Sequence, residues 1–185
     1  EENKPDIKHF FDPWHFVKNI KGKLRPLAIR KDRMILSEWI NPIGNHLYWC
    51  ANNCNKDPEK LIQMWKSLLY HVTDHHKFPD QFSKYPECQH REYTKEDSLR
   101  KKWIKKDSPA YQALKDVINN PRDIKDMAKL SEPYHTGYIE VFHSLLTSYA
   151  PKRQEFEINV MDARIKLAVL DHNSNVLRKY DIIKL

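Results

Sequence analysis

Glycine is scarce in this sequence, with 3 residues among 185. A chain so poor in glycine has no Gly-rich loop for nucleotide phosphates and few of the tight turns that a hairpin-rich β-sandwich needs. It also lacks any apolar run of about 18 residues, so the sequence predicts no membrane-spanning helix and no membrane partner. Residues 1–6 contain no apolar stretch of the kind found in secretory signals.

Cysteine is also rare. The 3 cysteines are an odd number and do not form the pattern of a disulfide framework. Histidine, in contrast, is abundant, and five of the 10 histidines lie between His46 and His90, the stretch that holds all three cysteines. Thiols beside imidazoles in a reducing compartment are typical of metal ligands. We therefore expect an intracellular protein.

The chain is basic and rich in aromatic residues. It has 32 Lys and Arg against 25 Asp and Glu, a net charge of +7, and it contains 5 Trp, 9 Tyr and 7 Phe. Disordered segments have few such large apolar groups, so this composition indicates a folded protein. The length is sufficient for one domain with a substantial core, or at most two small ones.

The apolar spacing predicts a mainly α fold, an α-rich member of the α+β class. Residues 7–12 are short and aromatic and predict one strand, which ends at Asp12 before Pro13 begins a helix. We expect Pro26 to end that helix and Asn41-Pro42 to interrupt the next one. Residues 77–95 have no clear period and predict a loop. The helical patterns cover 14–24, 33–54, 57–76, 108–118, 138–149 and 158–170.

Two carboxylates stand out. Asp12 follows the predicted strand, and Glu140 lies in the first turn of an amphipathic helix. Two hard oxygen ligands on a rigid scaffold are what Mg²⁺ requires. Both residue types are also common at helix starts, where Asp caps the helix and Glu complements its dipole. The residues alone leave both interpretations open.

The cysteines and histidines form a second candidate site, for zinc. A helix pair and the following loop supply thiol and imidazole groups, the ligands of a tetrahedral Zn²⁺. The alternative is that Cys50 and Cys54 are buried as small apolar side chains and that the histidines are hydrogen-bonded or exposed. His75 is a further candidate, four residues after His71. The predicted metal ligands are Cys50, His71, His76, Cys88 and His90.

Basic residues interleaved with aromatic ones predict contacts with a phosphate backbone. One group follows the first strand, a second surrounds Trp103, and a third follows the Glu140 helix. The alternative is an ordinary solvated surface, because +7 is modest for a chain of 185 residues. The predicted nucleic-acid contacts are Lys18, Lys21, Lys152 and Arg153.

Several stretches taken together resemble animal transposase-derived proteins with a DDE catalytic core on an RNase H-like fold, some of which carry THAP-type zinc fingers elsewhere. The similar stretches are 12–18 (DPWHFVK), 135–143 (HTGYIEVFH), 149–153 (YAPKR), 161–164 (MDAR) and 170–173 (LDHN). They cover most of the chain in order.

The resemblance implies a partial RNase H-like fold in three parts. Residues 1–24 would be the strand and helix that carry the second catalytic Asp, Asp12. Residues 25–130 would be a helical insertion with the Cys/His cluster, and residues 131–185 the core helices that carry the final Glu, Glu140. Related transposases often have a Cys/His motif in the insertion; Cys88-Gln89-His90 is similar, but its one-residue spacing departs from the two-residue form.

The first catalytic Asp of such a core should lie well upstream, and the chain begins only 11 residues before Asp12. We therefore expect a fragment of a transposase core, or a truncated relic, that is inactive alone. The parent would cleave and transfer DNA strands with Mg²⁺ in the nucleus, as a homo-oligomer if subunits assemble. The alternative is a non-enzymatic, zinc-stabilised domain, domesticated from a transposon, that binds DNA or another protein.

Overall fold

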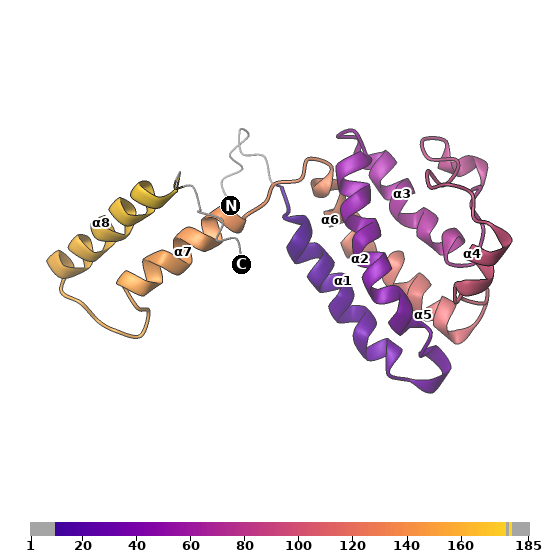
Figure 1. Cartoon of the computed structure of the whole chain (residues 1–185), viewed down its shortest axis with the longest axis horizontal. Helices are drawn as coiled ribbons and strands as arrows, with labels where there is room; N and C mark the ends of the chain where they lie inside the picture. Colours follow the sequence, from indigo (N-terminus) through magenta and orange to yellow (C-terminus); the bar gives the residue numbers. More distant parts are fainter. Residues whose placement is uncertain (1–9, 177, 179–185) are drawn as a thin grey trace, which may run out of the picture. The chain divides into compact units, whose positions relative to one another are not determined.

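The computed structural model describes residues 10–176 and 178, and it divides the chain into two units, Glu1–Tyr134 and His135–Leu185. All regular structure in the described residues is helical, apart from one isolated antiparallel bridge between Lys77 and Glu87 (Figure 1). None of the helices described has both the length and the apolar character needed to cross a bilayer.

In its described part, residues 10–134, the first unit contains six α-helices and three short 3-10 turns. Their bounds are α1 Pro13–Ala28, η1 Lys31–Arg33, α2 Leu36–Asn53, α3 Pro58–His71, η2 Asp80–Phe82, α4 Lys95–Arg100, α5 Pro109–Ile118, α6 Pro121–Met127 and η3 Ala128–Leu130. The second unit consists of α7 Gly137–Tyr149 and α8 Ile158–Asn175. The α-rich class is confirmed, while the RNase H-like arrangement stays a prediction.

Four helices begin with the same local device, a polar cap residue followed directly by proline. The cap side chains of Asp12, Asp57, Ser108 and Asn120 accept hydrogen bonds from backbone N–H groups of the first turn at 2.7–3.2 Å. Proline suits the first helical position because its missing N–H would have no partner there. The helix starts predicted at Asp57 and Ser108 are confirmed.

Three boundary predictions are wrong. Residues 10–12 are not a strand, and the rest of the predicted strand lies outside the described residues. Pro26 does not end α1, which continues to Ala28, and Pro42 lies inside α2 without ending it. Trp39 and Ile43 are buried on either side of Pro42, so packing on both flanks outweighs the backbone hydrogen bond that proline removes.

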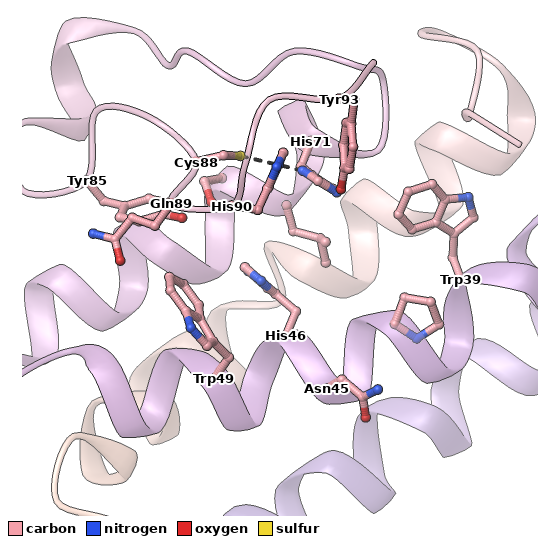
Figure 2. Close-up of a pocket in the computed structure, with 13 residues that line it drawn as sticks. Trp39, Asn45, His46, Trp49, His71, Tyr85, Cys88, Gln89, His90 and Tyr93 are labelled. Carbon is pink, nitrogen blue, oxygen red and sulfur yellow. Dashed lines mark hydrogen bonds between the residues drawn. The ribbon is translucent and has the colours of Figure 1, made fainter. Parts of the chain in front are cut away.

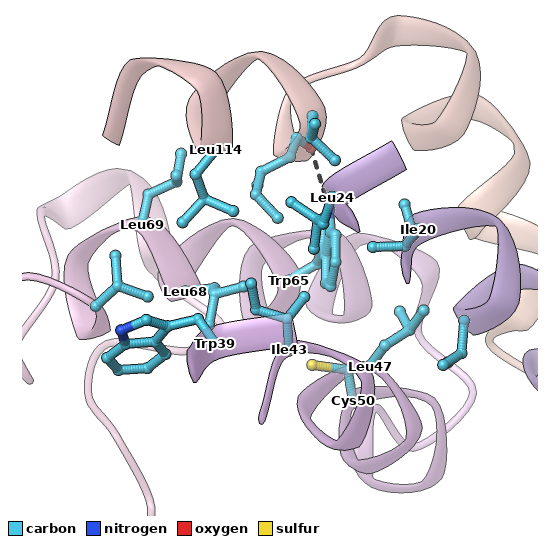
Figure 3. Packing of buried hydrophobic residues seen from close by; sticks show 14 of the residues in the cluster. Ile20, Leu24, Trp39, Ile43, Leu47, Cys50, Trp65, Leu68, Leu69 and Leu114 are labelled. Carbon is cyan, nitrogen blue, oxygen red and sulfur yellow. Dashed lines mark hydrogen bonds between the residues drawn. The ribbon is translucent and has the colours of Figure 1, made fainter. Parts of the chain in front are cut away.

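The core of the first unit lies between α1, α2, α3 and α5, with Trp65 of α3 inside it (Figure 3). The Trp65 side chain is fully buried, and its indole N–H donates to the Ile118 carbonyl at the end of α5 at 3.1 Å. Gly44 permits the close approach of α1 to α2, because a Cβ there would lie 3.1 Å from Val17 Cγ1. These contacts fix the position of α3, and the loop that follows α3 begins from it.

The second unit is a helical hairpin in which Tyr149, the last residue of α7, makes polar contacts with α8. The Tyr149 hydroxyl donates to Asp171 Oδ2 at 2.9 Å, and Arg164 donates to the Tyr149 carbonyl at 2.7 Å. The Arg164 guanidinium also lies over the Phe156 ring, 4.2 Å from its centroid. Ala168 is the one residue of its two helices that becomes buried.

The core predicts a large cost for truncating Trp65. Trp65→Ala should lower the free energy of unfolding of the first unit by about 3–5 kcal/mol, because it leaves a cavity and an unpaired Ile118 carbonyl. Urea unfolding followed by circular dichroism measures it. Trp14→Ala is the matched control, since the Trp14 side chain is 48% exposed; equal losses for the two variants would contradict this account of the core.

Candidate metal centre

The loop after α3 brings four potential metal ligands together. His71 is the last residue of α3, and the other three ligands, His76, Cys88 and His90, come from the loop that follows. Lys77 and Glu87 form an antiparallel bridge, and next to it the Cys88 amide donates to the His76 carbonyl at 2.8 Å. This pairing places His76 opposite Cys88 although 11 residues separate them in the chain.

A tight reversal at the end of α3 returns the chain towards His71. Asp74 has a φ of 63°, in the left-handed region that Asp adopts more readily than most residues, and the His75 amide donates back to the Tyr70 carbonyl at 3.1 Å. The loop is then anchored by aromatic packing, because the Phe78 ring lies 5.8 Å from Tyr70 and 5.6 Å from Tyr85, between centroids.

Two pairs of ligand atoms have the spacing of edges in a tetrahedral zinc site. One nitrogen or sulfur from each of the four residues lies within 4.8 Å of all the others. Cys88 Sγ is 3.5 Å from His71 Nδ1 (Figure 2), and His90 Nε2 is 3.2 Å from His76 Nδ1. Zinc bond lengths of about 2.0–2.1 Å to nitrogen and 2.3 Å to sulfur give tetrahedral edges of about 3.6 Å for S···N and 3.3 Å for N···N.

The outer nitrogens of two histidines have acceptors that set their tautomers. His76 Nε2 donates to Asp74 Oδ1 at 3.1 Å, and His90 Nδ1 donates to the Arg91 carbonyl at 2.6 Å. When both rings are neutral, their remaining nitrogens carry the lone pairs, and these are the two nitrogens that lie 3.2 Å apart. A carboxylate or carbonyl behind each imidazole is the usual arrangement around protein-bound metals. A cation between these lone pairs would relieve their repulsion.

Burial acts on the other two ligands. It lowers the pKa of His71 to about 3, with further contributions from the nearby His76 and His90, so this imidazole is neutral and able to bind a metal. Burial, together with the Glu87 carboxylate, raises the pKa of Cys88 to about 11. A metal at this position would displace the thiol proton, as zinc does in structural sites.

Four of the five predicted ligands are thus brought together, and Cys50 is not among them. Cys50 is fully buried in the hydrophobic core, with Sγ 3.4 Å from His46 Nε2. Cys54 is also buried, so Cys50 and Cys54 both pack as small apolar side chains. His75 does not join the group because α3 ends at His71, and His75 Nδ1 instead donates to the Thr73 carbonyl at 2.8 Å.

The spacing of Cys and His in the sequence does not predict the residues that orient the ligands. Asp74 is one, and its second oxygen accepts a hydrogen bond from Ser98 Oγ at 2.9 Å. Tyr93 is another, stacked on the His90 ring at a centroid distance of 4.4 Å. An acidic residue two positions before a ligand histidine was a usable signal for Asp74, whereas the position of Tyr93 depends on the path of the loop.

Asp12 and Glu140 lie in different units, and each has the local role that a helix start provides. Asp12 is buried and caps α1 by accepting from the Trp14 amide at 2.7 Å. Glu140 is the acidic residue in the first turn of α7, and the Thr136 hydroxyl lies 3.5 Å from its Oε1. Their convergence on Mg²⁺ stays a prediction.

The predicted phosphate contacts are divided between the two units. Lys18 is exposed, with Nζ 5.1 Å from the centroid of the Trp14 ring, and Lys21 Nζ donates to Asn41 Oδ1 at 3.0 Å. Lys152 and Arg153 are exposed in the turn between α7 and α8. Their role in binding DNA stays a prediction.

Comparisons of the chain with known protein families, curated proteins and solved structures find no match.

The geometry predicts that the chain binds about one zinc ion, as four protein ligands require. His71→Ala and Cys88→Ser should each lose the metal, whereas His75→Ala, which changes a histidine beside the group, should keep it. Metal analysis of purified protein measures zinc, and Co²⁺ substitution reports on Cys88 through the thiolate charge-transfer absorption in the near ultraviolet. Full zinc content in both ligand variants would show that the ion is held elsewhere.

Asp74 should tune the affinity without supplying a ligand. Asp74→Gly keeps a residue suited to positive φ but removes the acceptor for His76, so zinc affinity should fall about 10- to 100-fold. Asp74→Asn retains a side-chain oxygen acceptor and should lie between the glycine variant and the unchanged protein. Competition with a chromophoric chelator measures these affinities, and equal values for all three proteins would remove Asp74 from the metal centre.

Proposed function

We propose that the first unit is a zinc-stabilised module that binds nucleic acid. The observation that carries this proposal is the convergence of His71, His76, Cys88 and His90 in one loop. Four protein ligands complete a tetrahedral shell, which is typical of structural zinc, whereas catalytic zinc keeps a position open for water or substrate. The role we assign to the metal is therefore structural.

The loop that zinc would hold has little regular structure of its own. Between α3 and α4 it contains one 3-10 turn, Asp80–Phe82, and the isolated bridge Lys77–Glu87. Binding of zinc by ligands at both ends of this loop would add directly to the free energy of folding. It would fix Cys88 and His90 against the end of α3, and with them the chain that leads into α4.

The loop between α3 and α4, residues 72–94, is called the metal loop below. The positive charge next to it supports nucleic acid as the partner. The segment that follows His90 contains exposed basic residues on both sides of Trp103. Nucleic acid binds such surfaces by releasing the counterions that surround its phosphates. Among the side chains described in this segment, the exposed basic residues are Arg91, Arg100, Lys102, Lys105 and Lys106.

The resemblance to transposase-derived proteins favours DNA over other polyanions and a nuclear location. It also leaves a catalytic role for Asp12 and Glu140, with Mg²⁺, as a prediction for a longer parent protein. Within the described residues, capping by Asp12 and the first-turn position of Glu140 account for both carboxylates. Binding rather than cleavage is therefore the function that we propose.

The proposal predicts DNA affinity that depends on zinc and on salt. The purified chain should bind a duplex with an affinity that falls steeply as salt rises, because each phosphate contact releases counterions. Removal of zinc by a chelator should weaken binding, and Mg²⁺ should induce no cleavage. Fluorescence anisotropy and a nicking assay measure these properties. Mg²⁺-dependent cleavage that disappears in Asp12→Asn and Glu140→Gln would instead establish the catalytic function.

A further inference from the structure

A cavity of about 570 Å³ lies directly beside the metal ligands. One wall is a single face of α2, which contributes Trp39, Asn45, His46 and Trp49 (Figure 2). Trp39 and Trp49 are ten positions apart, which corresponds to about 15 Å along the helix. Its volume falls within the range of about 300–1,000 Å³ that ligand clefts occupy.

The opposite wall is the metal loop itself. Tyr85, Gln89 and Tyr93 line it, together with the ligands Cys88 and His90 (Figure 2). The lining thus combines indole and phenol rings with two exposed carboxamides, those of Asn45 and Gln89. Aromatic walls and side-chain amides are the groups with which proteins stack unpaired bases and hydrogen-bond to their edges.

A second hollow, of about 450 Å³, adjoins the cavity and is basic. It shares Trp39, His71 and Tyr93 with the cavity and adds Arg100 and Lys101. Glu38 and Lys102 also line it and form an ion pair with each other at 2.6 Å, so the net charge of the lining comes from Arg100 and Lys101. Lys101 Nζ lies 3.6 Å from the centroid of the Tyr93 ring. Among the described side chains, the ion pairs found include neither Arg100 nor Lys101. Two cations are therefore available to an anionic ligand at the rim of an aromatic cavity.

We propose that the cavity accepts an unpaired base of single-stranded DNA, with the adjoining phosphates against Arg100 and Lys101. This inference rests on the proposed function and names the form of nucleic acid that the module binds. An aromatic cavity of this size would also suit a methylated lysine, but the two cations at its rim repel a cationic ligand and attract a phosphate. The positive charge at the rim therefore favours a nucleotide over a methylated lysine as the ligand.

The first test compares ligands on the zinc-loaded chain by fluorescence anisotropy. A labelled oligothymidylate should bind at least about tenfold more tightly than an abasic oligonucleotide of equal length and charge, because only the former has bases to stack. Equal affinities would mean that the phosphates alone are bound and would overturn the inference. Tight binding of a trimethyl-lysine peptide without binding of oligothymidylate would also overturn it.

The second test blocks the cavity and then discharges its rim. Asn45→Phe places a ring at the cavity and should weaken oligothymidylate binding about tenfold. Asn52→Phe is its control, two turns further along the same face of α2 at an exposed position outside the lining. Arg100→Ala with Lys101→Ala should have a comparable effect, whereas Lys115→Ala with Lys125→Ala removes the same charge at exposed positions outside both hollows and should change affinity less than about twofold.

Zinc content and the unfolding midpoint of each variant show whether it is folded. If zinc-loaded protein binds duplex DNA with the expected salt dependence but neither Asn45→Phe nor the Arg100 and Lys101 pair weakens oligothymidylate binding, this inference alone is wrong. If the chain binds neither duplex nor oligothymidylate, the proposed function is wrong as well.

Discussion

The hydrogen bond from the Cys88 amide to the His76 carbonyl, 2.8 Å long, is the contact on which the candidate site depends. Together with the hydrogen bond from the Phe78 amide to the Pro86 carbonyl, also 2.8 Å long, it aligns two segments of the loop, and it places a thiol and an imidazole near His71. A single backbone contact of this kind contributes only about 0.5–1.5 kcal/mol. The packing of Phe78 against Tyr70 and Tyr85 adds to it, and a bound metal would complete the constraint.

The parts of this fold that the sequence predicts are those determined by neighbours in the chain. A cap residue followed by proline decides a helix start almost alone, and the starts at Asp57 and Ser108 follow from it. The continuation of α2 through Pro42 depends on burial against other helices, which proline patterns do not report. His76 lies among the ligands and His75 does not because the chain makes a left-handed turn at Asp74. The four-residue spacing of His71 and His75 assumes that the helix continues, so it does not predict this turn.

Asp12 illustrates how one observation can serve two hypotheses. A carboxylate that caps a helix accepts hydrogen bonds from backbone N–H groups. The same hydrogen bonds would fix the orientation of the carboxylate if it also bound a metal. Capping is thus compatible with a catalytic ancestry and yet sufficient without it. The Cys/His group differs, because helix capping does not account for three imidazoles and a thiol whose ligand atoms lie within 4.8 Å of one another, with acceptors behind two of the rings. Because capping accounts for Asp12 and not for the Cys/His group, the proposed function rests on the candidate zinc site rather than on the carboxylates.

The candidate metal site and the aromatic cavity share the residues of one loop. Cys88 and His90 alternate along the loop with Gln89, so the chain that would bind the metal also forms a cavity wall. Tyr93 stacks on His90 while its ring lies under Lys101, which links the imidazole to the basic rim. A metal that fixes the His90 ring would therefore also restrict Tyr93 and, through it, the position of the Lys101 ammonium group. Structural zinc in this unit would act on ligand binding through preorganisation, by removing the conformational freedom that the loop would otherwise lose on contact with DNA.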